Sequence, residues 1–316
     1  MNLPRVTVVG AGQVGATTAH LLALKGLAQV TLIDVVEGLA KGKALDLSQA
    51  APIEGFSATI QGTTDYGALA GSRLVVITAG LARKPGMSRE DLLAANAGIV
   101  GPIAERVAAL APDALILVVT NPLDLMVALA LQRSGFTRQR VMGMAGVLDT
   151  ARLRAFIAQR LGVPPSAVQA MVLGSHGDLM VPLRGSITVN GRPVTERLPP
   201  AEVDRVLQRT KDGGAELVAL LKQGSAFYAP ASGVVEMAGA ILQDRHAVLP
   251  VCAALQGEYG LREVCLGVPA QLGIAGVERI VELELTPEER AALAAAAEQV
   301  RAGIKNLASL QATTRP

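Results

Sequence analysis

Short apolar runs and helical segments alternate through the first half of the chain. The runs that predict strands are residues 6–9, 30–33, 74–78, 115–120 and 141–144. They are rich in Val, Ile and Leu with little polar alternation, which is typical of parallel strands buried on both faces. Helical segments separate them, the first an Ala-rich stretch that ends where Gly26 suits a C-terminal cap. This order predicts an α/β fold with a doubly wound parallel sheet, which we assign to residues 1–144.

The second half mixes helices with short strands that alternate less regularly. Helices are expected from Asp149 to Leu161, from about Pro200 past Leu220, up to Leu242, and from Pro287 onward behind a Thr286–Glu289 capping box. Strands are expected at 168–173, 247–252 and 264–268, with a hairpin over 187–194 that turns at Asn190-Gly191. We therefore expect an α+β domain over residues 145–316.

The composition fits a folded protein without a nucleic-acid or membrane surface. Half of the 316 residues are apolar, and 29 basic and 27 acidic side chains leave a net charge of +2. No 18 consecutive residues are all apolar, and the first strand begins too early to leave room for a signal peptide. Cys252 and Cys265 lack metal-ligand spacing. We expect no metal and a reduced cytoplasmic chain, although a single disulfide stays open.

Three glycines follow the first predicted strand in the order G-x-G-x-x-G. Gly10 permits a tight turn, Gly12 lets the backbone approach a pyrophosphate, and Gly15 allows close packing of a helix on a strand. Asp34 ends the second strand, where a carboxylate can accept both ribose hydroxyls of an adenosine and would repel a 2′-phosphate. The alternative interpretation of the three glycines is a glycine-rich turn that binds no nucleotide. The order of strand, glycines, helix, strand and acid instead predicts a Rossmann domain that binds NAD rather than NADP.

A basic segment follows the third predicted strand. Residues 79–89 contain Arg83, Lys84 and Arg89 and two glycines, before a helix that starts near Ser88. Such a run is usually a solvated loop. At the ligand-facing end of a sheet it can equally be a lid that brings arginines over an anion.

The remaining polar candidates lie after the fourth and fifth strands. Asn121-Pro122 places an amide where a nicotinamide and a substrate should lie, and His176 stands between two glycines in a loop. Asp149 and Arg152 share one helical face, because they are three residues apart. An exposed ion pair and a non-catalytic loop histidine are the plain alternatives. The functional interpretation has Arg152 gripping a carboxylate while Asp149 meets the histidine.

At this point the chain resembles the lactate/malate dehydrogenase superfamily, over nearly its whole length. The matching motifs are G-A-G-Q-V-G from Gly10, G-L-A-R-K-P-G-M-S-R-E-D from Gly80, N-P-L-D from Asn121, L-D-T-A-R from Leu148, G-S-H-G-D from Gly174 and G-V-E-R-I-V-E-L-E-L from Gly276.

The resemblance implies a role for each candidate. His176 is the implied acid/base and Asp149 its carboxylate partner, while Arg152 clamps the substrate carboxylate. Arg89 polarises the carbonyl, and Asn121 binds substrate and cofactor. The implied NAD site comprises Gly10, Gly12, Gln13, Val14, Gly15, Asp34, Asn96 and Asn121. Members of the family form dimers and tetramers, so a homodimer or homotetramer is expected.

Within the superfamily, the first cation of the basic segment separates the substrates. Malate enzymes place arginine there, as here with Arg83, whereas lactate enzymes usually place glutamine. Oxaloacetate carries a second carboxylate that needs a cation when it leaves water, and pyruvate offers only a methyl group. Ala226 fits the longer substrate, because lactate enzymes commonly carry threonine at that position.

The chain therefore most resembles the lactate-dehydrogenase-like malate dehydrogenases of bacteria, with (S)-malate and oxaloacetate as expected substrates. Three alternatives stay open: a lactate or other 2-hydroxyacid dehydrogenase, a non-catalytic NAD-binding or structural protein, and a methyltransferase on a similar sheet.

Overall fold

The computed structural model describes residues 3–82 and 87–313, without the side chains of Arg89 and of residues 310–313. The elements of the first half are β1 (Arg5–Val9), α1 (Gln13–Leu24), β2 (Gln29–Ile33), α2 (Leu39–Glu54), β3 (Ile60–Thr63), β4 (Leu74–Ile77), α3 (Arg89–Leu110), β5 (Leu115–Val118), α4 (Leu123–Ser134) and β6 (Val141–Gly143).

The elements of the second half are α5 (Gly146–Leu161), β7 (Val168–Gln169), β8 (Val172–Gly174), β9 (Met180–Pro182), β10 (Thr188–Val189), β11 (Arg192–Pro193), α6 (Pro200–Leu221), α7 (Tyr228–Leu242), β12 (Ala247–Gln256), β13 (Arg262–Gly273), β14 (Gly276–Ile280) and α8 (Pro287–Thr313).

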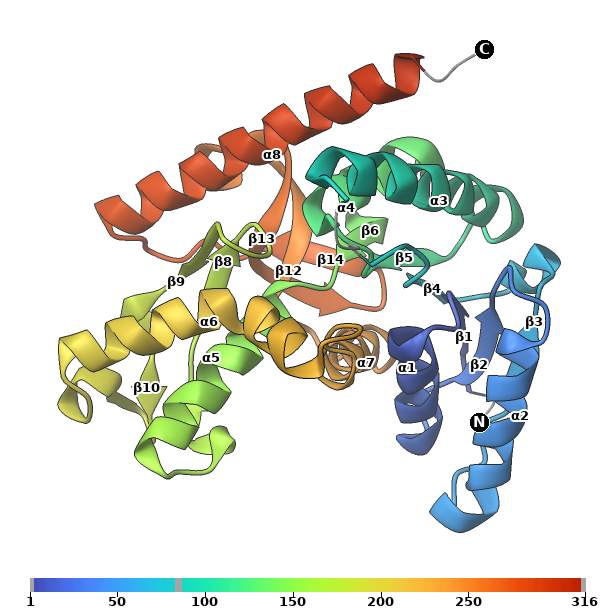
Figure 1. The fold of residues 1–316 in the computed structure, drawn as a ribbon, viewed down its shortest axis with the longest axis horizontal. Helices are drawn as coiled ribbons and strands as arrows, with labels where there is room; N and C mark the ends of the chain where they lie inside the picture. Colours follow the sequence, from blue (N-terminus) through green and yellow to red (C-terminus); the bar gives the residue numbers. More distant parts are fainter. Residues whose placement is uncertain (1–2, 83–86, 314–316) are drawn as a thin grey trace.

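The first six strands form a parallel sheet in the order β3-β2-β1-β4-β5-β6, which confirms the predicted Rossmann architecture. Helices α3 and α4 lie on one face of this sheet, and α1 and α7 lie on the other (Figure 1). Alternate strand residues therefore enter two separate hydrophobic clusters: Val8 and Val76 contribute to the α1/α7 side, and Val9 and Ile77 to the α3/α4 side. All four of these side chains are at most 1% exposed, as expected of parallel strands covered on both faces.

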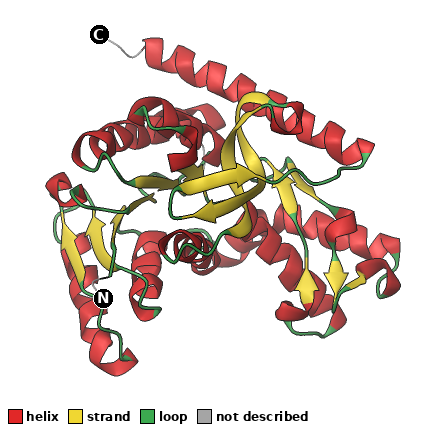
Figure 2. Cartoon of the chain, turned by 180° about the vertical axis from the view of Figure 1, so that it is seen from behind, coloured by secondary structure: helices red, strands yellow, loops and turns green. Residues whose placement is uncertain are grey.

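The predicted last strand of the parallel sheet is not the edge of the whole sheet. Gly143 of β6 pairs with Cys252 of β12, and through this pair the sheet continues into the antiparallel strands of the second half. A Cβ at Gly143 would lie 3.1 Å from the Cβ of Cys252, so a small residue is needed where the two strands meet. Strands β12 and β13 also extend beyond the predicted ranges 247–252 and 264–268. Seen from behind, the two parts form one continuous body (Figure 2).

The single strand predicted over residues 168–173 is wrong. The structure has two short strands there, and they belong to different sheets: β7 pairs with β10, and β8 pairs with β9 and β13. Between them the backbone N–H of Met171 donates to Ser186 Oγ rather than to a strand. The apolar pattern of these six residues, five of them apolar, cannot reveal this change of partner.

Two local predictions for the second half, the hairpin turn and the capping box of the last helix, are confirmed. Asn190 and Gly191 have φ values of 51° and 77°, as the predicted tight hairpin turn requires. The capping box of α8 is present: Thr286 Oγ1 accepts from the backbone N–H of Glu289, whose Oε2 accepts from the N–H of Thr286. Strands β3 and β14 and helix α4 were not individually predicted.

Two features of the interior bear on the class of protein. Cys252 and Cys265 are both buried free thiols, so no disulfide joins them. Residues 90–110 of α3 form the one helix in the described chain that is long and apolar enough to cross a membrane, with mean hydropathy 1.2. Helix α3 packs against α4, and its Val100, Ala104 and Val107 are fully buried against the sheet, as in a core helix.

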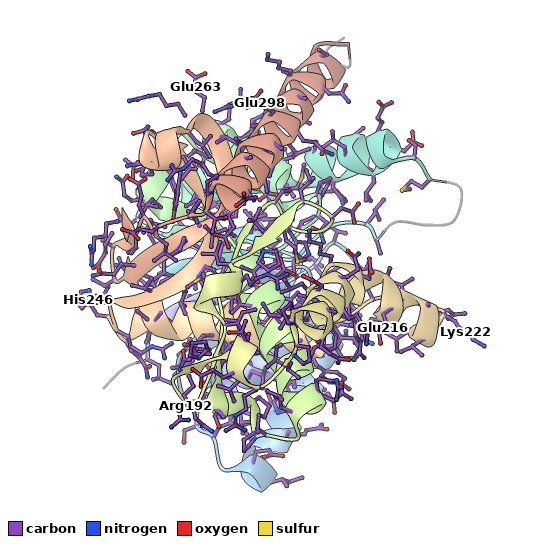
Figure 3. All side chains as sticks on the ribbon, turned by 90° about the vertical axis from the view of Figure 1, so that its left-hand side faces the viewer. Arg192, Glu216, Lys222, His246, Glu263 and Glu298 are labelled. Atoms are coloured by element: carbon purple, nitrogen blue, oxygen red, sulfur yellow. The ribbon has the colours of Figure 1, made fainter. Side chains whose placement is uncertain are left out.

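His246 lies at the surface, in the turn that joins α7 to β12 (Figure 3). It stands between two carboxylates. Its Nδ1 lies 2.9 Å from Oε2 of Glu278, and its Nε2 lies 3.6 Å from Oδ2 of Asp244. The hydrogen bond to Glu278, with the charges of Asp244 and Glu278, raises the pKa of His246. This cluster ties the end of α7 to β14 in a charge-dependent way.

We predict that the stability contributed by His246 depends on pH. Because its folded pKa is raised above the unfolded value of about 6.5, the contribution is fully present below about pH 6.5 and disappears as the pH rises through the folded value. Urea unfolding should show that His246→Gln lowers the free energy of unfolding more at pH 6 than at pH 9. Arg192→Gln, at another exposed cation, serves as the control and should show no such pH-dependent difference. An equal effect of His246→Gln at both pH values would contradict the prediction.

Candidate active site

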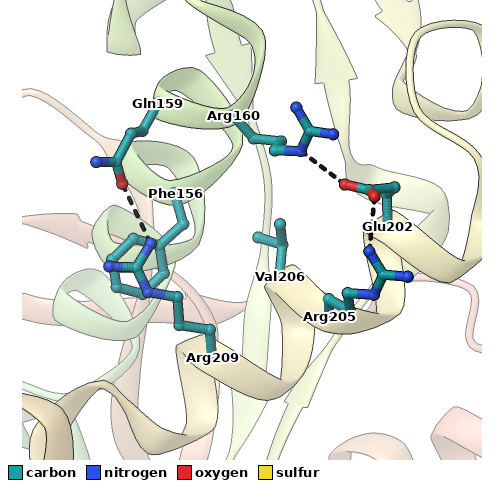
Figure 4. Close-up of a pocket in the computed structure, with 7 residues that line it drawn as sticks. All are labelled: Phe156, Gln159, Arg160, Glu202, Arg205, Val206 and Arg209. Atoms are coloured by element: carbon teal, nitrogen blue, oxygen red, sulfur yellow. Dashed lines mark hydrogen bonds and ion pairs between the residues drawn. The ribbon is translucent and has the colours of Figure 1, made fainter.

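Two hollows in the described surface are candidate sites, and the first is lined by ion pairs of the protein itself. It measures about 490 Å³ and lies between α5 and α6 (Figure 4). Glu202 accepts hydrogen bonds from both Arg160, at 2.6 Å, and Arg205, at 2.7 Å. The guanidinium of Arg209 lies over the ring of Phe156. None of the predicted site residues lines this hollow, and its cations are paired within the protein.

The second hollow is a cleft of about 600 Å³ that contains two of the predicted residues, Asn121 and His176. Its walls come from the end of β5 and the first turn of α4, from the β8–β9 loop, from the first residues of α3, and from α8. We therefore take this cleft as the candidate active site.

His176 is oriented by a hydrogen bond between its ring and Asp149. The Nδ1 atom lies 2.9 Å from Oδ2 of Asp149, whose side chain is only 2% exposed. An ionised carboxylate only accepts hydrogen bonds, so Nδ1–H is the donor. This leaves Nε2 as the ring nitrogen that can exchange a proton with a molecule in the cleft.

The second oxygen of Asp149 holds Arg152. Oδ1 lies 3.3 Å from Nη1 of Arg152, one turn further along α5, and the arginine side chain is 13% exposed. The sequence placed Asp149 and Arg152 on one helical face, and the fold brings His176 to the same carboxylate. The three side chains form a continuous polar array from α5 to the β8–β9 loop.

The electrostatics of this array favour the imidazolium form. Burial by itself disfavours the charged ring, but the charge and hydrogen bond of Asp149 outweigh burial, so the pKa of His176 is raised. The charge of Arg152 opposes this rise and that of Asp124 adds to it. The ring is therefore suited both to accept and to donate a proton near neutral pH.

Asn121 is held at the mouth of the cleft by Asn96. The Nδ2 of Asn96 donates to the backbone oxygen of Asn121 at 2.6 Å and to that of Leu81 at 3.1 Å, while its Oδ1 accepts from the N–H of Leu81. Asn96 is fully buried, so its contact with a cofactor stays a prediction. In the structure it fixes the backbone on either side of the ligand-facing edge.

The glycine loop after β1 has the shape that a dinucleotide requires. Gly10 has φ +106°, and a Cβ there would lie 2.6 Å from the N of Ala79 after β4. A Cβ on Gly15 would lie 1.8 Å from the backbone oxygen of Gly10, which explains the close packing of α1. A Cβ on Gly12 would instead point into open space. The loop therefore lies at the topological switch between β1 and β4, where ligands bind in such sheets.

This loop also has free binding capacity. No side chain caps the N-terminus of α1, so the first N–H groups of that helix, beginning at Gln13 and Val14, are available to an anion such as a pyrophosphate. Asp34 accepts from the N–H groups of Ala11 and Val36, one on each oxygen, and so braces the loop. Each oxygen keeps a second lone pair for a ribose hydroxyl. These residues fit the predicted NAD.

Part of the basic segment lies outside the described residues. Arg83 and Lys84 fall in this part, and the side chain of Arg89 is also not described. The described chain resumes at Met87, and α3 begins as predicted: Ser88 and Asp91 form a capping box. The roles of Arg83 and Arg89 therefore stay predictions.

Two residues in the cleft, Asp124 and Ser175, were not predicted as site residues from the sequence. Asp124, in the first turn of α4, is 4% exposed, and its Oδ2 accepts from Ser175 Oγ at 2.5 Å and from the N–H of His176 at 3.2 Å. An acid in the first turn of a helix is ordinarily attributed to the helix dipole, so the sequence offered no reason to connect it with the histidine.

Comparison with known proteins gives consistent matches to one family. Residues 4–143 match the NAD-binding domain of lactate/malate dehydrogenases, and residues 146–311 match the alpha/beta C-terminal domain of the same family. The malate dehydrogenase of Nostoc punctiforme is 55% identical over 304 residues, which cover 96% of this chain and 93% of that protein.

Solved structures are similar over the same length. The malate dehydrogenase of Cryptosporidium parvum superposes with a TM-score of 0.95 at 41% identity, covering 97% of this chain and 99% of that one. The lactate dehydrogenase of Eimeria maxima, solved with NADH and oxamate, also gives 0.95, at 37% identity and with 100% and 97% coverage.

The array makes a prediction that needs no ligand. In Asp149→Asn, the amide keeps a hydrogen-bond acceptor but loses the charge that stabilises the imidazolium, so the pKa of His176 should fall below its wild-type value. The chain has three histidines, so an NMR titration of their ring protons can be assigned. His246 should titrate identically in both proteins and is the internal reference. An unchanged His176 titration would exclude Asp149 as the group that sets the ring's charge.

Proposed function

This chain belongs to the lactate/malate dehydrogenase family, and on that premise we propose that it is an NAD-dependent malate dehydrogenase. The reaction is the reversible oxidation of (S)-malate to oxaloacetate, and bound NAD supplies the acceptor for the hydride. The observation that carries the proposal is the His176–Asp149–Arg152 array beside Asn121, in a chain 55% identical to a malate dehydrogenase.

The nucleotide site consists of the glycine loop and Asp34. The uncapped N-terminus of α1, together with Gly10, Gly12 and Gly15, would hold the pyrophosphate. The two oxygens of Asp34 would accept the ribose hydroxyls. A phosphate at that position would face a carboxylate, so NAD is preferred over NADP.

His176 moves the proton. During malate oxidation the neutral ring accepts the hydroxyl proton at Nε2, because Nδ1–H is engaged by Asp149. During oxaloacetate reduction the ring begins protonated and donates from Nε2 to the developing alkoxide. Asp149 keeps the ring in one orientation in both directions and stabilises the charged form.

Arginines bind the dicarboxylate. Arg152, which is held by Asp149, would clamp the carboxylate next to the reacting carbon in a two-pronged contact. We assign the distal carboxylate to Arg83 and the carbonyl oxygen to Arg89, from their places in the sequence. Asn121 would bind the substrate and the cofactor at the mouth of the cleft. An arginine at position 83 favours oxaloacetate over pyruvate, because only oxaloacetate offers it a partner.

We further propose that the protein is a cytoplasmic homodimer or homotetramer, with no nucleic-acid or membrane partner. Large apolar side chains support self-association: Ile53 on α2 is 86% exposed, and Leu220 and Tyr228 near the junction of α6 and α7 are 72% and 71% exposed.

The substrate assignment is tested by measuring NADH-dependent reduction of oxaloacetate and of pyruvate. The wild type should strongly prefer oxaloacetate. Arg83→Gln should lower kcat/KM for oxaloacetate by roughly 10² to 10⁴-fold and raise it for pyruvate, because a site built for a polar partner rejects the analogue that lacks it.

Arg152→Leu is the matched control, since it removes the cation that both substrates need and should reduce both activities. A wild-type preference for pyruvate would favour the lactate alternative. NADH binding without turnover of either acid would favour a non-catalytic protein. If Arg83→Gln leaves the ratio of the two activities unchanged, Arg83 does not select the substrate.

Cofactor choice makes a separate prediction about Asp34. The wild type should use NADH much better than NADPH, and Asp34→Ser should narrow that gap because it removes the charge that repels the 2′-phosphate. The readout is the ratio of kcat/KM for the two cofactors, since Asp34 also braces the loop and both values can fall. Glu37→Gln, an exposed acid three residues further on, should leave the ratio unchanged. Equal use of both cofactors by the wild type would contradict the assignment.

A further inference from the structure

Asp124 is a buried carboxylate that the proposed chemistry does not use. It lies in the first turn of α4, lines the cleft and is 4% exposed. Burying a carboxyl group is costly unless it is hydrogen-bonded. A purely structural acid in a helix N-terminus usually turns to its own backbone N–H groups. Asp124 instead binds another element.

Two hydrogen bonds connect Asp124 to the loop that carries the proposed acid/base ring, and a third joins its carboxyl group to the thiol of Cys252 on β12. Its Oδ2 accepts from Ser175 Oγ at 2.5 Å and from the backbone N–H of His176 at 3.2 Å. Its Oδ1 accepts no hydrogen bond from a nitrogen or hydroxyl donor among the described residues. The carboxyl group therefore acts on two consecutive residues of the β8–β9 loop.

Asp124 is also close in sequence to a proposed substrate ligand. Three residues earlier stands Asn121, which lines the same cleft and whose carbonyl is fixed by Asn96. The segment 121–124 thus begins with a proposed substrate ligand, Asn121. It ends with Asp124, which binds the β8–β9 loop that carries His176. The ring of His176 is oriented from α5 by Asp149, and its backbone is held from α4 by Asp124.

We propose that Asp124 is a positioning residue for the proton transfer: by binding Ser175 Oγ and the N–H of His176, it fixes the place of the histidine relative to Asn121. This inference rests on the proposed function of His176 as the acid/base. A displacement of a reacting group by about 1 Å can cost on the order of 10²-fold in rate. The contact is therefore expected to affect turnover much more than binding.

The charge of Asp124 also raises the pKa of the His176 ring, separately from the hydrogen bonds that hold the loop. Among the described residues, the other titratable and charged groups that act on Asp124 or His176 or lie beside them are Asp149 and Arg152 on α5, Cys252 on β12 and Cys265 on β13, while Glu90 and Asp178 also line the cleft. Burial, with the nearby charge of Asp124, raises the pKa of Cys265 to about 12 and that of Cys252 well above its usual range, so both stay neutral thiols. Asp124 itself has a raised pKa because it is buried, and the bond from Ser175 opposes that rise.

The experiment compares two substitutions at position 124. Asp124→Ala removes the acceptor and should lower kcat for oxaloacetate reduction by roughly 10 to 100-fold, with KM for oxaloacetate and the Kd of NADH changed less than about threefold. Asp124→Asn keeps an oxygen that can accept from the same two donors, so it should restore kcat to within about fivefold of wild type. Ser175→Ala removes one of the donors and should fall between the two.

Ser134→Ala, at the far end of α4, is the control for a general disturbance of that helix and should leave kcat unchanged. Equal kcat in Asp124→Ala and wild type would show that the contact is only structural. Equal loss in Asp124→Ala and Asp124→Asn, in folded proteins, would show that the charge and not the hydrogen-bonded position is needed. If Asp124→Ala does not fold, wild-type kcat in Ser175→Ala overturns the proposal.

The substrate assignment and this inference can fail separately. If the wild type reduces pyruvate rather than oxaloacetate, the same comparison is made with pyruvate. If it turns over neither acid, the acid/base role on which the inference rests fails with the proposed function. An NMR titration of His176 then still tests the electrostatic coupling of Asp124 to the ring, because loss of the nearby Asp124 charge should lower the pKa of that ring. An unchanged titration in Asp124→Ala would show that no coupling exists.

Discussion

A single buried carboxylate, that of Asp149, connects the parts of this site. Its side chain is 2% exposed, and one oxygen faces His176 while the other faces Arg152. A buried charge is tolerable only when it is paired, and removal of one partner of such a pair typically costs about 3–5 kcal/mol. The same contact that orients the histidine ring therefore also keeps the proposed substrate clamp in place, so stability and chemistry depend on one group.

The sheet brings this array to the nucleotide-binding half. A single residue pair, Gly143 with Cys252, joins the parallel strands to the antiparallel strands. On one side of that join the chain continues into α5, which carries Asp149, and on the other β13 pairs with β8, which leads to His176. The reacting groups are therefore fixed by strand pairing rather than by long loops, as a site with hydrogen bonds of about 3 Å requires.

Amide and carboxyl groups brace the site from the nucleotide-binding half. Asn96 holds Leu81 and Asn121, Asp34 holds Ala11 and Val36, and Asp124 holds Ser175 and His176. Each binds backbone atoms at the end of a strand or in a neighbouring loop. Because the carboxyl ends of parallel strands share one edge of the sheet, a few short polar side chains can set the relative positions of loops that lie far apart in the sequence.

The sequence alone determined the elements whose causes are local. Five of the six parallel strands were predicted from runs rich in Val, Ile and Leu, and α8 from its capping box, whereas β3 (Ile60–Thr63) contains no such run and was not predicted. The tight Asn190-Gly191 turn follows from two residues that tolerate positive φ. The glycine motif and Asp34 were also recognisable in the sequence, and the structure explains two of the glycines, because a Cβ on Gly10 or Gly15 would collide with neighbouring backbone. Asp149, Arg152 and His176 were identifiable as candidates by residue type, spacing and family resemblance.

Tertiary structure decided what depends on partners distant in the chain. Residues 168–173 contribute to two sheets, because β7 at one end pairs with β10 and β8 at the other end pairs with β9. The hydrophobic periodicity of the segment does not specify these partners. Asn96 became a buried brace, and Asp124 became a partner of the histidine loop across 52 residues, since the direction of a polar side chain is set by what the fold places beside it. The pairing of Asp149 with His176 across 27 residues was likewise a family-based expectation until the β8–β9 loop was placed against α5.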